Sequence, residues 1–149
     1  MEECMNEKKG CTVVNHYYEC CGGSSNVAPV GENDYSTEET VCGKWIDGKP
    51  IYRKVITGTL AKDSGNGIIF GNISDLKVDQ LIKLYGNMPF KDNSYQIAFP
   101  ISYNEPKGVS AAINMYYDVH TGNICYYFLN HSGFYSGCTA YVVIEYTKQ

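Results

Sequence analysis

The chain has 149 residues, which suits one compact domain with room for a short extra segment, and it carries a formal net charge of −4 at pH 7. Its 12 Lys and Arg residues are scattered along the sequence, so we expect no basic surface for a nucleic-acid backbone. Fourteen Tyr, fifteen Gly and a charged fraction of only 19% favour strands over helices.

The sequence also indicates the cellular compartment in which the protein is made. No apolar run approaches the ~20 residues that a membrane-spanning helix needs, and the opening Met1-Glu-Glu-Cys is more polar and acidic than the start of a secretory signal peptide. We therefore expect synthesis in a cytosol and no membrane insertion. In that compartment the seven cysteines are expected to be reduced thiols.

Residues 1–34 differ in composition from the rest of the chain. The opening MEECMNEKKG is charged and has no hydrophobic period, and CTVVNHYYEC is compatible with one strand. The next stretch, CGGSSNVAPVGEND, is rich in Gly, Ser, Pro and Asn, as linkers are. We therefore predict a Cys-rich anchor or linker segment at 1–34 and a β-domain at 35–149.

A hairpin is predicted in EETVCGKWIDGKPIYRKV, where two strand-like runs flank an Asp-Gly pair that tolerates the positive φ angles of a tight turn. A two-residue turn would place Trp45 opposite Pro50 and would place Gly43 opposite Tyr52. The indole ring would then stack on the pyrrolidine above the space that the glycine leaves. The motif is interpreted as structural, and its residues are Gly43, Trp45, Asp47, Gly48, Pro50 and Tyr52.

A second hairpin is predicted in MYYDVHTGNICYYF. A two-residue turn at Thr121-Gly122 would pair His120 with Asn123. One face of the hairpin would then be apolar and the other amphipathic. The apolar face would hold Met115, Tyr117 and Val119 opposite Phe128, Tyr126 and Ile124.

Two other segments complete the pattern. SDLKVDQLIKLYG fits both helical and strand periods, and we predict a strand that is entered through one helical turn and ends at Leu84-Tyr85. The closing AYVVIEYTK is largely apolar on both faces, which predicts a central strand or one covered by a neighbouring subunit. The short strands and frequent turns predict an all-β fold, an antiparallel β-sandwich or jelly-roll-like domain.

Three segments of the chain also resemble a known family. YSTEETVCGKWIDGKPIYRKVITGTL resembles a segment of C-terminal modules in virion appendage proteins of tailed bacteriophages, namely tail fibres, baseplate-associated proteins and head fibres. YYDVHTGNICYY and AYVVIEYTK resemble the penultimate hairpin and the end of such modules. The resemblance covers about Tyr35 to Lys148.

This resemblance implies a β-rich, homotrimeric structural module on a virion surface, made in the cytoplasm of a bacterial host. Under this interpretation we expect no catalytic residue and no cofactor. A Cys-rich segment before the module is a departure from the family, so residues 1–34 are predicted to dock the module to other virion proteins. Trimeric presentation would let weak contacts with host surface carbohydrate act together.

Carbohydrate contacts are predicted for exposed Tyr and Asn side chains, because phenol rings stack on sugars while amides bond their hydroxyls. On the amphipathic hairpin face, Tyr116 and Tyr127 fit a subunit interface equally well, and both interpretations stay open. The candidate glycan contacts are Tyr95, Tyr103, Asn104, Tyr116, Asn130 and Tyr135.

Two alternative functions stay open. The first is an appendage polysaccharide hydrolase, which would need a pair of carboxylates; Asp75, Asp79, Asp92, Glu105 and Asp118 are available, in no recognisable context. The second is a small zinc-stabilised interaction module. Its ligands would come from Cys4, Cys11, His16, Cys20 and Cys21, which lack a tight Cys-x-x-Cys knuckle.

Thiol catalysis is also considered, because it needs a cysteine beside a histidine. On the predicted hairpin, His120 and Cys125 share a face, and His131 and Cys138 lie nearby in the sequence. A small buried cysteine is usually a packing residue, which favours the structural interpretation.

Overall fold

The computed structural model describes residues 13–14, 17–18, 31, 33–90, 93–94, 96–104, 110–130 and 133–149. The chain divides into two units, Met1–Gly31 and Glu32–Gln149. In the first unit, strands β1 (Val13–Val14) and β2 (Tyr17–Tyr18) pair in antiparallel fashion.

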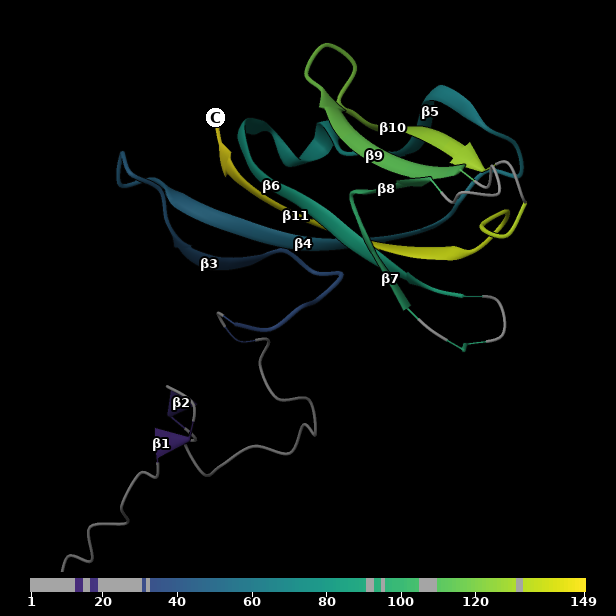
Figure 1. The fold of residues 1–149 in the computed structure, drawn as a ribbon. Helices are drawn as coiled ribbons and strands as arrows, with labels where there is room; N and C mark the ends of the chain where they lie inside the picture. Colours follow the sequence, from purple (N-terminus) through teal and green to yellow (C-terminus); the bar gives the residue numbers. More distant parts are fainter. Residues whose placement is uncertain are drawn as a thin grey trace, which may run out of the picture. The chain divides into compact units, whose positions relative to one another are not determined.

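The second unit is a sandwich of two antiparallel sheets, which Figure 1 shows as an upper and a lower layer. The four-stranded sheet has the order β5 (Gly65–Asn72), β10 (Asn123–Asn130), β9 (Ser110–Asp118) and β8 (Ile101–Asn104). The five-stranded sheet has the order β3 (Thr40–Lys44), β4 (Pro50–Thr59), β11 (Thr139–Lys148), β6 (Val78–Pro89) and β7 (Gln96–Phe99). The predicted all-β antiparallel sandwich is therefore confirmed.

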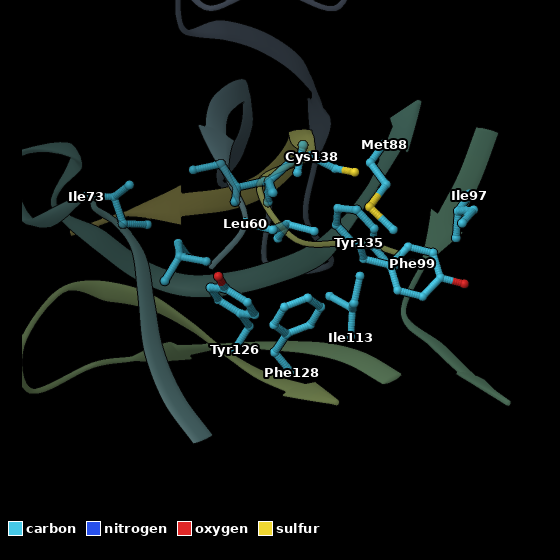
Figure 2. Packing of buried hydrophobic residues seen from close by; sticks show 14 of the residues in the cluster. Leu60, Ile73, Met88, Ile97, Phe99, Ile113, Tyr126, Phe128, Tyr135 and Cys138 are labelled. Atoms are coloured by element: carbon cyan, nitrogen blue, oxygen red, sulfur yellow. The ribbon is translucent and has the colours of Figure 1, made fainter. Parts of the chain in front are cut away.

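The core lies between the sheets and is built from alternate residues of the strands (Figure 2). Strand β10 contributes Tyr126 and Phe128, and β11 contributes Ile144 and Tyr146, all with at most 1% of their surface exposed. Burial of one such side chain stabilises the fold by about 1.5–3 kcal/mol. The Tyr126 hydroxyl accepts a hydrogen bond from the backbone N–H of Ala61 at 2.8 Å, so its burial leaves no unsatisfied oxygen.

Close approach of the two sheets depends on Gly58 in β4. A Cβ atom at this position would lie 2.8 Å from Cζ of Phe70, a ring that the opposite sheet contributes from β5. This distance is shorter than any ordinary carbon contact. The glycine therefore provides the space into which the Phe70 ring packs.

The β3–β4 hairpin exists where the sequence predicted it, but the predicted register is wrong. Lys44, and not Trp45, is opposite Pro50, and Gly43 is opposite Ile51. Ile46-Asp47-Gly48 forms a three-residue turn that the Trp45 N–H closes by donating to the Lys49 carbonyl oxygen at 2.8 Å. The physical reason is the backbone of Gly48, which has φ of 87° while Asp47 keeps a negative φ; a two-residue type I′ turn needs positive φ at both.

The β9–β10 hairpin shows a similar difference. Asn123 pairs with Asp118, so the turn spans 119–122 and the predicted register is wrong by two residues. The Asp118 carboxylate accepts hydrogen bonds from the His120 N–H at 2.9 Å and from the Thr121 hydroxyl at 2.8 Å, which stabilises this longer turn. A shift of two residues preserves the faces of the strands, so the apolar and amphipathic sides are as predicted, except that Val119 and His120 lie in the turn.

Strand β11 lies at the centre of its sheet, between β4 and β6, which confirms the prediction of a central strand. The predicted helical turn before β6 is also confirmed, as the 3-10 helix η1 (Ser74–Leu76). The predicted end of β6 at Leu84-Tyr85 is wrong, because the strand continues to Pro89. Pairing of Gly86–Pro89 with β7 supplies backbone hydrogen bonds that the turn-like letters GNMP do not indicate.

Candidate functional site

The predicted glycan contacts do not form one surface. Tyr95 lies outside the described residues, as does the side chain of Tyr103, while Asn104 ends the edge strand β8. Tyr116 is 46% exposed on the outer side of the four-stranded sheet.

Asn130 and Tyr135 have structural contacts in place of a solvent-facing position. Both are buried, and the Asn130 amide donates to the Ser136 hydroxyl at 2.9 Å. Its side-chain oxygen accepts from the backbone N–H of Tyr135 at 3.3 Å. These bonds hold the loop that joins β10 to β11, so neither side chain offers a surface to a sugar.

A groove of about 580 Å³ lies on the outer face of the five-stranded sheet. Its walls include three phenol rings, from Tyr35, Tyr85 and Tyr141, and sequence reasoning missed all three. Alternation along β11 places Tyr141, Val143 and Glu145 on the outer face, and this pattern in the sequence could have identified Tyr141 as a surface residue. The remaining lining residues are Ser36, Thr37, Val55, Thr57, Gly86, Asn87, Ala98 and Val143.

A charged cluster lies on the same face of the sheet as the groove. The Glu145 carboxylate, which is nearly fully buried, bonds Arg53 at 2.8 Å from β4 and Lys83 at 3.1 Å from β6. The guanidinium of Arg53 also lies beneath the Tyr35 ring, with its carbon 4.8 Å from the ring centre. The charges near the groove are therefore paired with one another.

The segment Tyr35–Glu39, which we call the strap, runs beside β4 ahead of β3, and its first residues form one wall of the groove. The backbone N–H of Val55 donates to the Ser36 carbonyl at 2.8 Å, which extends the pairing of β4 beyond β3. The Tyr35 and Tyr85 hydroxyls are hydrogen-bonded at 3.1 Å. Burial, together with this hydrogen bond, raises the pKa of Tyr85, so the phenol stays protonated at neutral pH.

Glu39 anchors the other end of the strap to the last strand. Its carboxylate accepts hydrogen bonds from the Tyr146 hydroxyl and from the Lys148 ammonium. Burial alone would raise the pKa of Glu39, but these two bonds outweigh it and the pKa is lowered from 4.5. Burial, and then the bond to Glu39, raises the pKa of Tyr146.

The outer side of the four-stranded sheet has a different character. Its strands contain a single charged residue, Asp118, at the turn. Cys125 pairs with Ile69 on one side and with Tyr116 on the other, so these three residues form a row across β5, β10 and β9. We call this surface the neutral face and define it by Ile69, Ala112, Asn114, Tyr116, Cys125, Tyr127 and Leu129.

The alternative chemistries gain no geometric support from the described part of the chain. There, no group of three or more His, Cys, Asp or Glu side chains could hold a metal ion, and the five predicted zinc ligands lie outside it. Cys125 and Cys138 are buried free thiols, and Cys125 lies in a strand while His120 lies in the turn, so their predicted common strand face is wrong. Of the predicted carboxylates, Asp79 pairs with Lys49, and Asp92 and Glu105 lie outside the described residues.

Comparisons with known proteins found no matching family model, no matching curated protein and no matching solved structure. In the part of the chain that is described, none of the helices has the length and apolarity needed to cross a membrane.

Proposed function

We propose that this chain is a structural subunit of a tailed-bacteriophage virion appendage, a fibre or a tail or head appendage, and that its sandwich domain assembles as a homotrimer through the neutral face. The observation that carries the proposal is the scarcity of charge on the described strands of the four-stranded sheet. The resemblance of the hairpin and closing-strand sequences to appendage modules supplies the biological setting.

The charge distribution supports assembly through one sheet. The strands of the four-stranded sheet contain one charged residue, Asp118. The charged residues in the strands of the five-stranded sheet are Lys44, Arg53, Lys54, Asp79, Lys83, Glu145 and Lys148. A surface exposed to water normally carries a quarter or more of charged residues. Interface cores are depleted of charge and enriched in aromatic residues, and the neutral face has this composition.

The exposed side chains of the neutral face support the same assignment. Ile69 is 60% exposed and lies in one row with Tyr116, and Tyr127 is also exposed. The Tyr116 hydroxyl reaches over Gly67 of β5, so the ring covers the neighbouring strands. Contact with the neutral faces of further copies would remove this apolar surface from water without burying an unpaired charge.

The subunit needs no catalytic residue or cofactor for this role. Residues 1–34 would dock it to other virion proteins, and the assembled domain would present three equivalent surfaces to the host. Three weak contacts on one trimer raise the overall affinity for a host surface without any new contact. The protein would be made in the cytoplasm of the bacterial host and act in the virion.

Light scattering on the purified full chain at micromolar concentration tests the proposal. The expected mass is three times the 16.6 kDa of the chain. Dilution should lower this mass reversibly, because the contact is non-covalent. A monomer at micromolar concentration would overturn the assembly, and a stable dimer would overturn the threefold arrangement.

A further inference from the structure

The groove on the five-stranded sheet carries no formal charge. Its lining combines three phenol rings, three aliphatic side chains, Gly86 and four side chains that bear a hydroxyl or an amide, namely Ser36, Thr37, Thr57 and Asn87. The nearest cluster of charges consists of Arg53, Glu145 and Lys83, which neutralise one another in part. Within the lining itself, an acidic or basic ligand would therefore find no charged partner, while an uncharged ligand would match the groove.

The central strand under the groove, β11, offers side chains to a ligand but no free backbone groups. Val143 of β11 pairs with Val55 of β4 on one side and with Tyr85 of β6 on the other. The peptide groups of this central strand are therefore used inside the sheet. An extended peptide binds a sheet by pairing with the backbone of an exposed edge, and the central strand β11 under the groove provides none.

We infer that this groove is a binding site for a neutral saccharide. A sugar ring has an apolar face of C–H groups and a rim of hydroxyls, and the groove supplies partners for both. The Tyr141 and Tyr85 rings provide apolar surface against the ring face, and Thr57 and Asn87 provide donors and acceptors for the rim. The volume of about 580 Å³ is in the range of small-ligand sites. The inference rests on the proposal that the subunit contacts a host surface, and it names the chemistry of that contact.

Contacts within the protein fix the position of the strap before a ligand binds. Tyr35 is held above Arg53 by a cation–π contact and is joined to the Tyr85 hydroxyl across the sheet. A wall that is fixed before binding reduces the entropy that the ligand must overcome. Assembly through the neutral face would leave the groove open, since the two surfaces are on opposite sides of the sandwich.

Titration of the full chain by NMR and calorimetry tests the inference. The probes are neutral glucose and N-acetylglucosamine oligosaccharides, an acidic galacturonate oligosaccharide, and an uncharged eight-residue peptide rich in Val and Thr. We expect the amide shifts of β4, β6 and β11 around the groove to move with at least one neutral saccharide and with neither of the other probes. Tyr141→Ala should weaken this binding by about tenfold, as loss of one ring contact would.

Phe134→Ala is the matched control, because Phe134 is an exposed aromatic residue that does not line the groove. This variant should bind the saccharide as the wild type does. The inference is overturned if no neutral saccharide binds, if the peptide alone moves the groove resonances, or if Tyr141→Ala binds unchanged. Light scattering on the same samples separates the two proposals, since Tyr141→Ala should keep the wild-type mass.

Discussion

The two outer faces of the sandwich differ in charge far more than in apolar content. Tyr116 on the neutral face and Tyr141 on the groove face are almost equally exposed, at 46% and 42%. The groove face, however, includes the Arg53, Glu145 and Lys83 cluster, and the neutral face has no counterpart. Burial of an ion is costly even when it is paired, and Lys83 of this cluster is 61% exposed, so it is the neutral face that another copy can cover at the lower cost.

The largest expected effect is loss of assembly when a charge is placed on the neutral face. Tyr116→Glu would put a carboxylate in the row with Ile69, where three subunits would each have to desolvate it. We expect the full chain to become a monomer by light scattering while its circular dichroism stays that of the wild type.

Ile46→Glu is the control for this variant. Ile46 is 91% exposed in the β3–β4 turn, so the same kind of charge there should leave the mass at that of the wild type. Equal masses for the two variants, whether both trimeric or both monomeric, would contradict the assignment of the subunit interface to the neutral face.

The next effect concerns the buried carboxylate on the groove face. Arg53→Met would leave Glu145, whose side chain is 4% exposed, with Lys83 as its remaining ion-pair partner, and we expect a loss of about 3 kcal/mol in the free energy of unfolding. Lys83→Met removes the outer partner, which is 61% exposed, and should cost about 1 kcal/mol or less. Urea denaturation at pH 7 and one fixed protein concentration would measure both, and equal losses would contradict the assigned roles.

A third prediction affects both faces together, because it acts on the spacing of the sheets. Gly58→Ala would place a methyl group against the Phe70 ring, and we expect a loss of about 1–3 kcal/mol. Gly71→Ala is the control, since a Cβ there would lie 3.7 Å from Ile56 Cγ2, an ordinary contact. Equal unfolding temperatures for the two variants would show that the spacing between the sheets adjusts freely to the added methyl group.

The smallest effect is the pH dependence of the strap. The pKa of Glu39 is lowered in the folded protein, so its contribution is full above pH 4.5 and is lost as the pH falls through the folded pKa. Glu39→Gln should therefore cost up to about 1 kcal/mol at pH 7 and less near about pH 3, because the stabilisation declines as the pH falls below 4.5. Urea midpoints at the two pH values measure this difference, and a cost that is the same at both would exclude the carboxylate as the cause.

The sequence predicted the elements of this fold better than their registers. Alternation identified the core side of the β9–β10 hairpin, because a shift of two residues leaves every side chain on its face. The register itself depends on hydrogen bonds in the turns, such as those from His120 and Thr121 to Asp118, which no hydrophobic pattern encodes. The same reason accounts for the wrong pairing of Trp45.

The residues that line the candidate site were harder to predict from the sequence than the strands. Tyr35, Tyr85 and Tyr141 come from a loop and two strands, and only the pairing of β4, β11 and β6 places them around one groove. Asn130 and Tyr135 look like exposed loop residues in the sequence, yet both are buried, and the Asn130 side chain bonds the backbone N–H of Tyr135. Long-range pairing therefore determines which of the many tyrosines face solvent and which of those face one another.

Hydroxyl-radical footprinting of the full chain at micromolar concentration is the sharpest test of assembly through the neutral face, because Tyr116 and Tyr141 have nearly equal exposure on opposite faces. We expect Tyr116 and Ile69 to be protected from oxidation in the assembly while Tyr141 reacts as an exposed tyrosine, and dilution to the monomer should remove the difference. Equal oxidation of Tyr116 and Tyr141 in the assembled protein, or protection of Tyr141 alone, would contradict assembly through the neutral face.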